Sequence, residues 1–142
     1  FQNCKNLKQA KFPNSCQIIA PVTFANTGLT TMIIGNNVTT IWYGAFSCCP
    51  LNAFYSYTQT PPVIDYVNGL PDTAISNMPT EIRYSFGGVN KDNATLYVPA
   101  GCKAAYEASD WAKYFGTIVE MSTVTNNNED GGATAPNMGG LN

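Results

Sequence analysis

Residues 34–46 read IGNNVTTIWYGAF, and residues 12–24, which lie 22 positions earlier, read FPNSCQIIAPVTF. Few letters are identical in the two stretches, but residues of the same kind occupy the same places. The residues that recur at this interval include Leu7, Leu29 and Leu51, as well as Phe24 and Phe46. The chain therefore contains an internal repeat with this interval.

A repeat of this length predicts the fold. A period of 20–29 residues with fixed apolar positions is typical of a leucine-rich-repeat solenoid. One unit cannot bury its own hydrophobic side chains, whereas stacked units share an apolar column, and each large side chain fully removed from water contributes roughly 1.5–3 kcal/mol. We expect one short strand from each repeat in a parallel sheet, over residues 7–12, 29–34 and 51–57. The turn pairs Pro13-Asn14 and Gly35-Asn36 end the first two strands, because proline cannot donate to a ladder and Gly-Asn favours a bend.

The C-terminal part departs from the repeat. Residues 95–99 (TLYVP) restore a strand and its turn, whereas residues 102–109 contain good helix formers and predict a short helix. Ser109 can cap a second turn that contains Trp111. Such a helical segment suits the end of a solenoid, where the last coil has no neighbour to cover it. The sequence thus predicts an α/β repeat fold, a short leucine-rich-repeat solenoid with a small parallel sheet and a C-terminal helical cap.

We expect four parts along the chain. Turn formers and a lack of periodicity mark an insertion after the repeats, and an aperiodic Asn-, Gly- and Thr-rich end indicates a flexible tail. The expected parts are 1–62 (leucine-rich repeats), 63–84 (insertion), 85–121 (final repeat and cap) and 122–142 (tail).

Composition excludes several functions. Charged residues make up 11% of the chain, against about 25% in a typical soluble domain, and the net charge is −2. Nucleic-acid binding requires a basic field, so we expect no nucleic-acid partner. The chain has no histidine, which removes Ser-His-Asp and Cys-His catalysis and histidine-ligated zinc. No apolar run approaches the ~20 residues of a membrane span, so we expect no membrane span in this chain.

The five cysteines do not indicate a disulfide framework. Their number is odd, so they cannot all pair within one chain, and no C-x-x-C motif occurs. We expect them to act as small buried hydrophobic residues. They are Cys4, Cys16, Cys48, Cys49 and Cys102.

Acidic residues provide the only enzymatic hypothesis. Asp65, Asp72 and Glu81 all fall in the expected insertion. Glycoside hydrolysis would need two carboxylates facing one another at ~5–9 Å, and nothing in the sequence places any two of them so. No run of oxygen ligands typical of a calcium loop occurs either. We therefore expect no enzymatic activity, no metal site and no cofactor.

The strands predict a candidate binding face. Alternation along each strand points Met32 and Ile34 inward, so Ile33 points outward, together with its counterparts in the neighbouring repeats. An exposed row of aromatic side chains is a platform for a protein loop or a sugar ring. The outward row runs from Lys11 through Ile33 and Tyr55 to Tyr97, and Tyr57 extends it. The alternative is that the insertion folds over this face and the row is a satellite core.

Two groups of motifs resemble a known family. The repeats contain FPNS at residues 12–15, NNVTTI at 36–41 and GAF at 44–46, and the end segment contains TLYVPAGCKAAY at 95–106. These motifs, which cover about two thirds of the chain, resemble the BspA-like leucine-rich-repeat proteins of bacteria. The resemblance implies a repeat solenoid, export to the cell surface and a role in adhesion or recognition, without catalysis. Many such proteins are similar to those of gut and oral Bacteroidetes.

The expected function follows from the repeat and the resemblance together. We expect a non-catalytic protein-interaction or adhesion module of an exported bacterial surface protein, with a host or microbial surface protein, or a glycan, as its partner. One alternative is a purely structural capping or spacer end of a longer surface protein. A carbohydrate-binding module is a further alternative.

Overall fold

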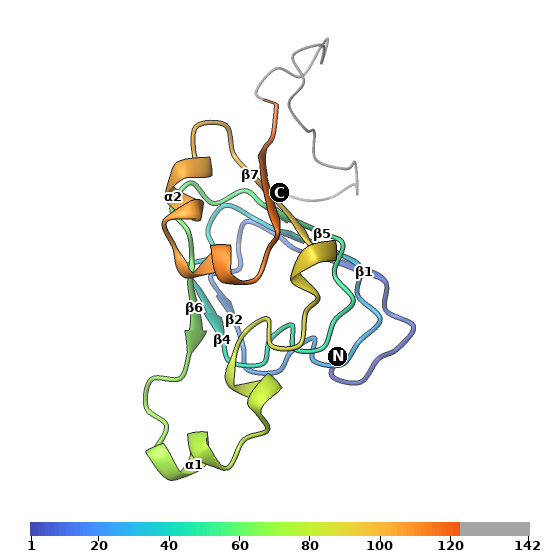
Figure 1. The fold of residues 1–142 in the computed structure, drawn as a ribbon, viewed down its shortest axis with the longest axis vertical. Helices are drawn as coiled ribbons and strands as arrows, with labels where there is room; N and C mark the ends of the chain where they lie inside the picture. The colour runs from blue at the N-terminus through green and yellow to red at the C-terminus, as the bar shows by residue number, and fades with distance from the viewer. Residues whose placement is uncertain (123–142) are drawn as a thin grey trace.

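The computed structural model of the chain describes residues 1–122, which form a short solenoid with two parallel sheets (Figure 1). The larger sheet has the order β1-β3-β5-β7-β8, and the smaller one has the order β2-β4-β6. The strands are β1 (Gln9–Phe12), β2 (Ile18–Ile19), β3 (Thr31–Ile34), β4 (Thr40–Trp42), β5 (Ala53–Ser56), β6 (Val63–Tyr66), β7 (Thr95–Val98) and β8 (Thr117–Glu120). The helices are α1 (Asp72–Ser76), α2 (Lys103–Glu107) and the 3-10 turns η1 (Thr80–Arg83), η2 (Lys91–Asn93) and η3 (Asp110–Lys113).

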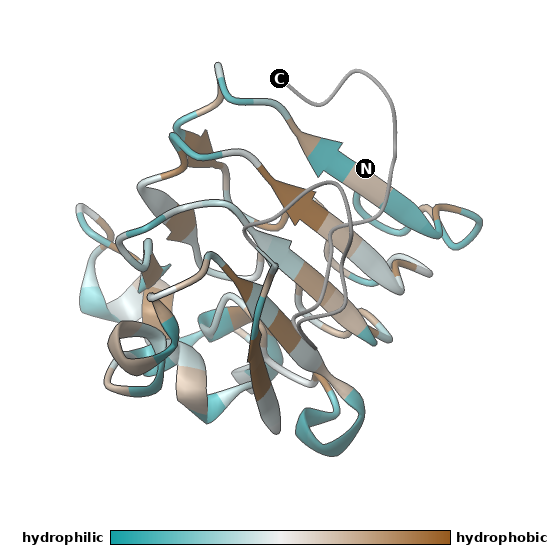
Figure 2. Ribbon diagram, turned by 90° about the horizontal axis from the view of Figure 1, so that it is seen from above, coloured by the Kyte–Doolittle hydropathy of each residue, from teal (hydrophilic) through white to brown (hydrophobic). Residues whose placement is uncertain are grey.

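The repeat sets the register of the larger sheet. Met32 pairs with Ala10 on one side and with Phe54 on the other, so each step across these strands advances the sequence by one repeat. The predicted leucine column is confirmed, because Leu29 and Leu51 are buried and Leu7 packs against the same core. Figure 2 shows these strands side by side, with β1, next to the N-terminus, as the most hydrophilic of them.

Each coil contributes a second strand, which was not predicted from the sequence. In β2, β4 and β6 the inward residues Ile19, Ile41 and Ile64 are buried. The last of these strands comprises the first four residues of the expected insertion, and its Val63 pairs with Thr40. Pairing with β4 thus draws the first four residues of the expected insertion into the smaller sheet.

Stacked phenylalanine rings run along the coils between the sheets. Phe24 stacks on Phe46 with ring centroids 5.4 Å apart, and Phe46 stacks on Phe86 at 5.3 Å. Phe1 stacks on Phe24 at 5.6 Å, although 71% of its surface is exposed. Phe24 and Phe46, which recur at the repeat interval, are both buried in the core.

Asparagine side chains join the first two coils where their strands end. Asn14 Oδ1 accepts a hydrogen bond from the backbone N–H of Asn36 at 3.0 Å. Asn37 Nδ2 donates to the backbone oxygen of Asn14 at 2.6 Å. The turn pairs predicted after residues 12 and 34 therefore end both strands and connect adjacent coils.

The predicted helical cap covers the end of the solenoid. Trp111 is fully buried, and its ring centroid lies 5.4 Å from that of Phe54 and 5.2 Å from that of Phe86. Ser109 caps η3 as expected, because its hydroxyl accepts a hydrogen bond from the N–H of Trp111. The chain then continues into β8, which adds a strand to the larger sheet that was not expected.

The expectation that the cysteines are buried is wrong for four of the five. Only Cys49 is buried, and its Sγ donates to the backbone oxygen of Phe24 at 3.0 Å while burial raises the pKa of its thiol. Cys4 and Cys48 are exposed, and the other two are partly exposed, so four of these positions do not need an apolar side chain.

The expected tail, 122–142, lies outside the described residues except for Ser122.

Candidate functional site

The outward row predicted on the larger sheet is in register in the structure. Ile33 pairs with Lys11 on β1 and with Tyr55 on β5, and Tyr55 pairs with Tyr97 on β7. The added strand β8 brings Val119 opposite Tyr97. The row thus crosses every strand of this sheet. Residues 117–120 (TIVE) lie one repeat interval after residues 95–98 (TLYV), which was the signal for Val119, but their position after a helical cap concealed it.

Exposure differs along this row. Ile33 is 0% exposed, so it has no surface for a partner, whereas Tyr55, Tyr97 and Tyr57 are half-buried. Ile33 lies between the long side chains of Lys11 and Tyr55. The expectation that Ile33 is an exposed contact residue is therefore wrong. The part of the row that a partner can reach comprises Tyr55, Tyr57 and Tyr97, which we call the tyrosine face.

The centre of the tyrosine face is a stacked pair. The rings of Tyr55 and Tyr97 are nearly parallel, with an interplanar angle of 9° and centroids 4.4 Å apart. This spacing follows from their register, because adjacent strands lie about 4.8 Å apart. Partial burial raises the pKa of the Tyr55 phenol, and the nearby Tyr97 and Tyr57 raise it further. Burial also raises the pKa of Tyr57, so both hydroxyls stay protonated near neutral pH.

A second, more polar row lies beside the tyrosine face. It occupies the position two residues earlier on each strand and therefore shares the outward side. Its members are paired in register across the sheet and carry no charge. They are Gln9, Thr31, Ala53, Thr95 and Thr117. The outward surface is therefore a flat arrangement of phenol rings beside small neutral side chains, which suits shape-dependent contact with a partner.

Residues 67–84 pack away from the tyrosine face. Arg83 folds this segment on itself, because its guanidinium donates to the backbone oxygens of Ser76 at 2.9 Å and Met78 at 3.2 Å. Glu81 passes so close to Gly87 that a Cβ at Gly87 would collide with the Glu81 backbone. Figure 1 shows α1 at the opposite end of the molecule from β7. In the alternative, this segment would fold over the aromatic row; in the structure it lies elsewhere.

The acidic residues of the expected insertion, 63–84, do not form a pair. The Asp65 carboxylate accepts hydrogen bonds from the Ser85 N–H at 2.7 Å and from the Tyr114 hydroxyl at 2.8 Å. Asp72 lies in the first turn of α1, and Glu81 lies in η1, where both are exposed. Within residues 1–122, no group of three His, Cys, Asp or Glu side chains is placed to hold a metal ion.

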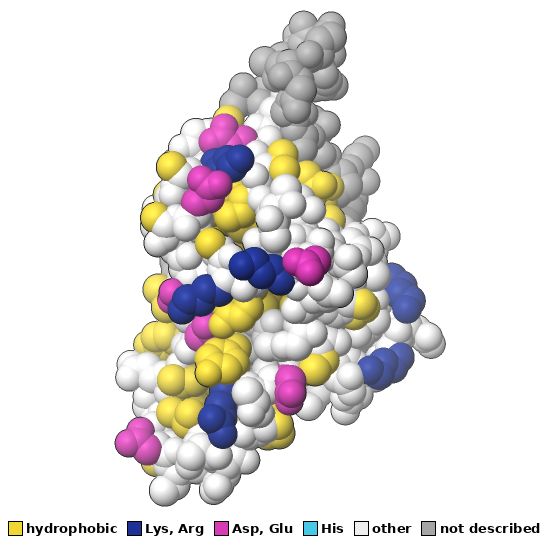
Figure 3. All heavy atoms as spheres, viewed as in Figure 1, with side chains coloured by type: hydrophobic (Ala, Val, Ile, Leu, Met, Phe, Trp, Pro, Cys, Tyr) yellow, Lys and Arg dark blue, Asp and Glu magenta, His cyan; other side chains and the backbone are white. Residues whose placement is uncertain are grey.

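Charged side chains do not gather into a patch on the face that Figure 3 shows. Figure 3 shows a face dominated by uncharged atoms, over which acidic and basic side chains are scattered. The salt bridges are local, such as Lys113 with Asp110 at 3.1 Å, and both side chains are largely exposed. Exposed pairs of this kind contribute little to stability.

In the part of the chain that the structure describes, no helix is long and apolar enough to cross a membrane.

The coils define the class of protein. Successive repeat units, each with a parallel strand on a shared apolar column, form a leucine-rich-repeat solenoid. Residues 1–63 match the model of the BspA type leucine rich repeat region in 6 copies, so this region of the chain is similar to that family. No curated protein and no solved structure matched the chain.

The family assignment supports a general statement of function. A BspA-type leucine-rich repeat region is a protein-interaction repeat module, and such regions are typically found in surface or exported bacterial proteins. Leucine-rich repeats are typically not catalytic.

Proposed function

We propose that this chain is a non-catalytic adhesion module of an exported bacterial surface protein, and that it binds a host or microbial surface protein through the tyrosine face. The observation that carries the proposal is the Tyr55–Tyr97 stack on the outward side of the larger sheet. Tyrosine is enriched at protein interfaces because one end of its side chain is apolar and the other forms hydrogen bonds.

Several features support this use of the face. Pairing of β5 with β7 brings Tyr97 beside Tyr55 and Tyr57, so a partner would contact side chains from two coils that are distant along the chain. The inward residues of the same strands, such as Phe54 and Leu96, are buried in the core and hold the strands in place. A rigid support limits the entropy lost on binding.

The remaining parts of the proposal extend the family assignment. Export to the cell surface and an origin of the kind found in Bacteroidetes follow from the resemblance of the motifs. We also propose that residues 63–84 are an insertion, the first four residues of which form β6, and that residues 85–121 form the last coil and its cap. No cofactor is needed for binding of this kind.

The test compares matched tyrosine variants. The purified chain would be used to capture proteins from surface extracts of bacteria and of epithelial cells, and the affinity of each captured partner would be measured. We expect Y55S/Y97S to weaken binding at least tenfold, whereas Y84S, which removes an exposed tyrosine elsewhere, leaves it unchanged. Equal affinity of Y55S/Y97S and the parent chain would contradict the proposal.

A structural role is the second candidate. It is favoured by polar side chains that bond to the backbone of the preceding coil rather than face a partner. Thr30 Oγ1 donates to the Lys8 oxygen at 3.1 Å, and Thr39 Oγ1 donates to the Gln17 oxygen at 3.3 Å. If no partner is captured and the variants behave alike, this spacer role is the better interpretation.

A further inference from the structure

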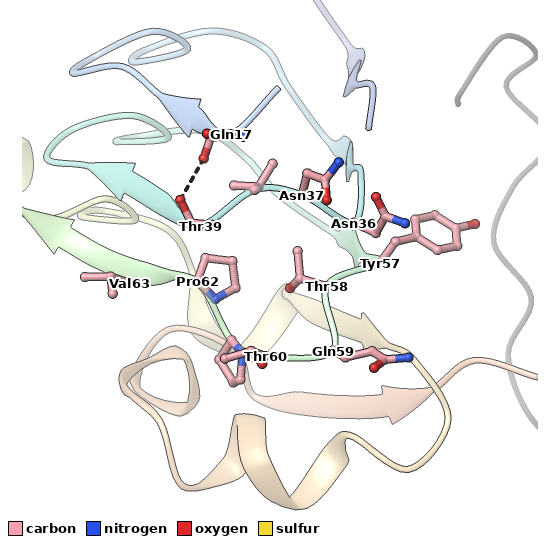
Figure 4. A pocket seen from close by; sticks show the side chains of 12 residues that line it. Gln17, Asn36, Asn37, Thr39, Tyr57, Thr58, Gln59, Thr60, Pro62 and Val63 are labelled. Atoms are coloured by element: carbon pink, nitrogen blue, oxygen red, sulfur yellow. Dashed lines mark hydrogen bonds between the residues drawn. The ribbon is translucent and has the colours of Figure 1, made fainter. Parts of the chain in front are cut away.

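A groove opens at the edge of the solenoid where the second and third coils separate (Figure 4). It has a volume of about 660 Å³, which is within the range of small-molecule sites of ≈ 300–1,000 Å³. Asn36, Asn37 and Thr39 line one side, and Gln59, Thr60 and Pro62 line the other. It lies at the turn after the strands and is thus distinct from the centre of the tyrosine face.

The groove exists because the asparagine contacts stop after the second coil. In the first coil, the Asn14 side chain and backbone hold Asn36 and Asn37. In the third coil, the place that corresponds to Asn36 is occupied by Thr58. Thr58 turns inward, where its backbone oxygen accepts a hydrogen bond from the Tyr106 hydroxyl at 2.7 Å. Backbone hydrogen bonds join the second and third coils on either side of the groove, from the Tyr57 N–H to the Ile34 oxygen at 3.2 Å and from the Val63 N–H to the Thr39 oxygen at 2.9 Å, and the groove opens between them.

The far wall of the groove is held in place by the cap. Trp111 Nε1 donates to the backbone oxygen of Pro62 at 2.9 Å, and Trp111 itself is fully buried. Ser56 Oγ lies 2.8 Å from the Tyr106 hydroxyl, which fixes the start of the same segment. The two successive prolines further restrict the backbone. The groove is therefore formed before any ligand arrives.

The side chains that line the groove are uncharged, and several of them can both donate and accept hydrogen bonds. None of the residues that line the groove carries a charge. The side-chain amides of Asn36 and Gln59 form no hydrogen bond with other residues in the range 1–122, although each can donate and accept. Pro61, which is half-buried, and Val63, which is exposed, add apolar surface beside these polar groups.

We propose that this groove binds a neutral oligosaccharide. Each sugar unit has hydroxyl groups that both donate and accept, which the amides and hydroxyls of the lining complement. Its C–H surfaces match the apolar surface of Pro61 and Val63. A phosphate or carboxylate ligand would need a cation or several converging N–H donors, and the lining residues supply no cation.

The test uses defined probes. The hexamers of β-1,4-glucose, α-1,4-glucose, β-1,4-mannose, β-1,4-xylose and N-acetylglucosamine would be titrated into the folded chain and followed by calorimetry. We expect at least one hexamer to bind, and N36A/Q59A to weaken it at least tenfold. N52A/Q2A is the matched control, because it removes one exposed asparagine and one exposed glutamine outside the groove and should leave the affinity unchanged.

Three outcomes would overturn the proposal. They are no binding of any of the five hexamers, equal binding by N36A/Q59A and the parent chain, or binding of a neutral hexapeptide with the affinity of the best hexamer. The melting temperature of N36A/Q59A shows whether the variant is folded, and single N36A and Q59A variants replace it if it is not. Because Y55S/Y97S should bind the oligosaccharide normally, failure here is distinguishable from failure of the tyrosine face.

Discussion

The hydroxyl of Tyr114 donates a hydrogen bond of 2.8 Å to Asp65 Oδ2, although the two residues are 49 positions apart. The other carboxylate oxygen of Asp65 accepts from the N–H of Ser85 at 2.7 Å. Ser85 Oγ in turn lies 3.1 Å and 3.0 Å from the backbone oxygens of Ile41 and Trp42. One carboxylate thus connects β6, the coil that carries Phe86, and the cap.

The Asp65 carboxylate should therefore stabilise the fold. Asp65 has φ 57°, a backbone conformation that asparagine also tolerates, so D65N changes the side chain without adding backbone strain. We expect D65N to lower the free energy of unfolding by about 1–3 kcal/mol, because an amide cannot accept both hydrogen bonds as strongly. Urea unfolding would measure the change. The control D72N, at an exposed position, should change it by less than about 0.5 kcal/mol, and a similar effect of both variants would contradict the role of Asp65.

The same contact predicts a dependence on alkaline pH. Burial and the Asp65 carboxylate raise the pKa of Tyr114 above its ordinary value of about 10. Above pH 10 the unfolded chain loses this proton while the folded chain keeps it, so stability falls as pH rises. Measuring the melting temperature between pH 8 and pH 11 should show this fall, with a shallower slope in Y114F. Burial also raises the pKa of Tyr106, so part of the slope remains in the variant. An unchanged slope in Y114F would show that Tyr114 does not contribute.

The stacked phenylalanines should differ in importance according to burial. Phe46 is fully buried between Phe24 and Phe86, so F46A should lower the free energy of unfolding by about 3–5 kcal/mol. Phe1 ends the same stack but is 71% exposed, and F1A should lower it by less than about 1 kcal/mol. Denaturant unfolding of both variants provides the comparison. If F46A and F1A lowered the free energy of unfolding equally, burial of the ring would not determine its contribution to stability.

The tyrosine pair provides a test of whether the outward face is open. Tyr55 and Tyr97 are half-buried, and a double-mutant cycle with Y55S and Y97S should give a coupling energy of about 0.5–1.5 kcal/mol, as for other stacked rings. Thermal and urea unfolding of the four proteins would measure it. If the double variant instead lost more than about 4 kcal/mol, as a buried aromatic core would, the tyrosines would be packing residues and the face would not be a binding surface.

Much of the solenoid could be predicted from spacing alone. The repeat interval places Leu29 and Leu51 on the same column, because side chains at equal positions in stacked coils must meet. Alternation within each strand then places Tyr55 and Tyr97 on the outward side and in register. These features depend on local sequence and on translation by one repeat.

Long-range packing decided the remaining features. Val63–Tyr66 pairs with β4 in a shifted register, and Thr117–Glu120, which lies one repeat interval after Thr95–Val98, follows a helical cap. Each stretch became a strand because a neighbouring strand offered it free backbone groups. Thr58 turns inward, where it forms hydrogen bonds with Ser56 and with Tyr106 of the cap, and the groove opens beside Asn36.

Taken alone, the amino-acid sequence predicts a short solenoid with parallel strands, an outward aromatic row and a helical cap. Packing in three dimensions determines that Ile33 is buried within that row, that Cys4 and Cys48 are exposed, and that a smaller second sheet forms. The physical reason is that periodicity specifies which side chains of stacked coils meet, whereas burial and strand pairing depend on segments far away in the chain.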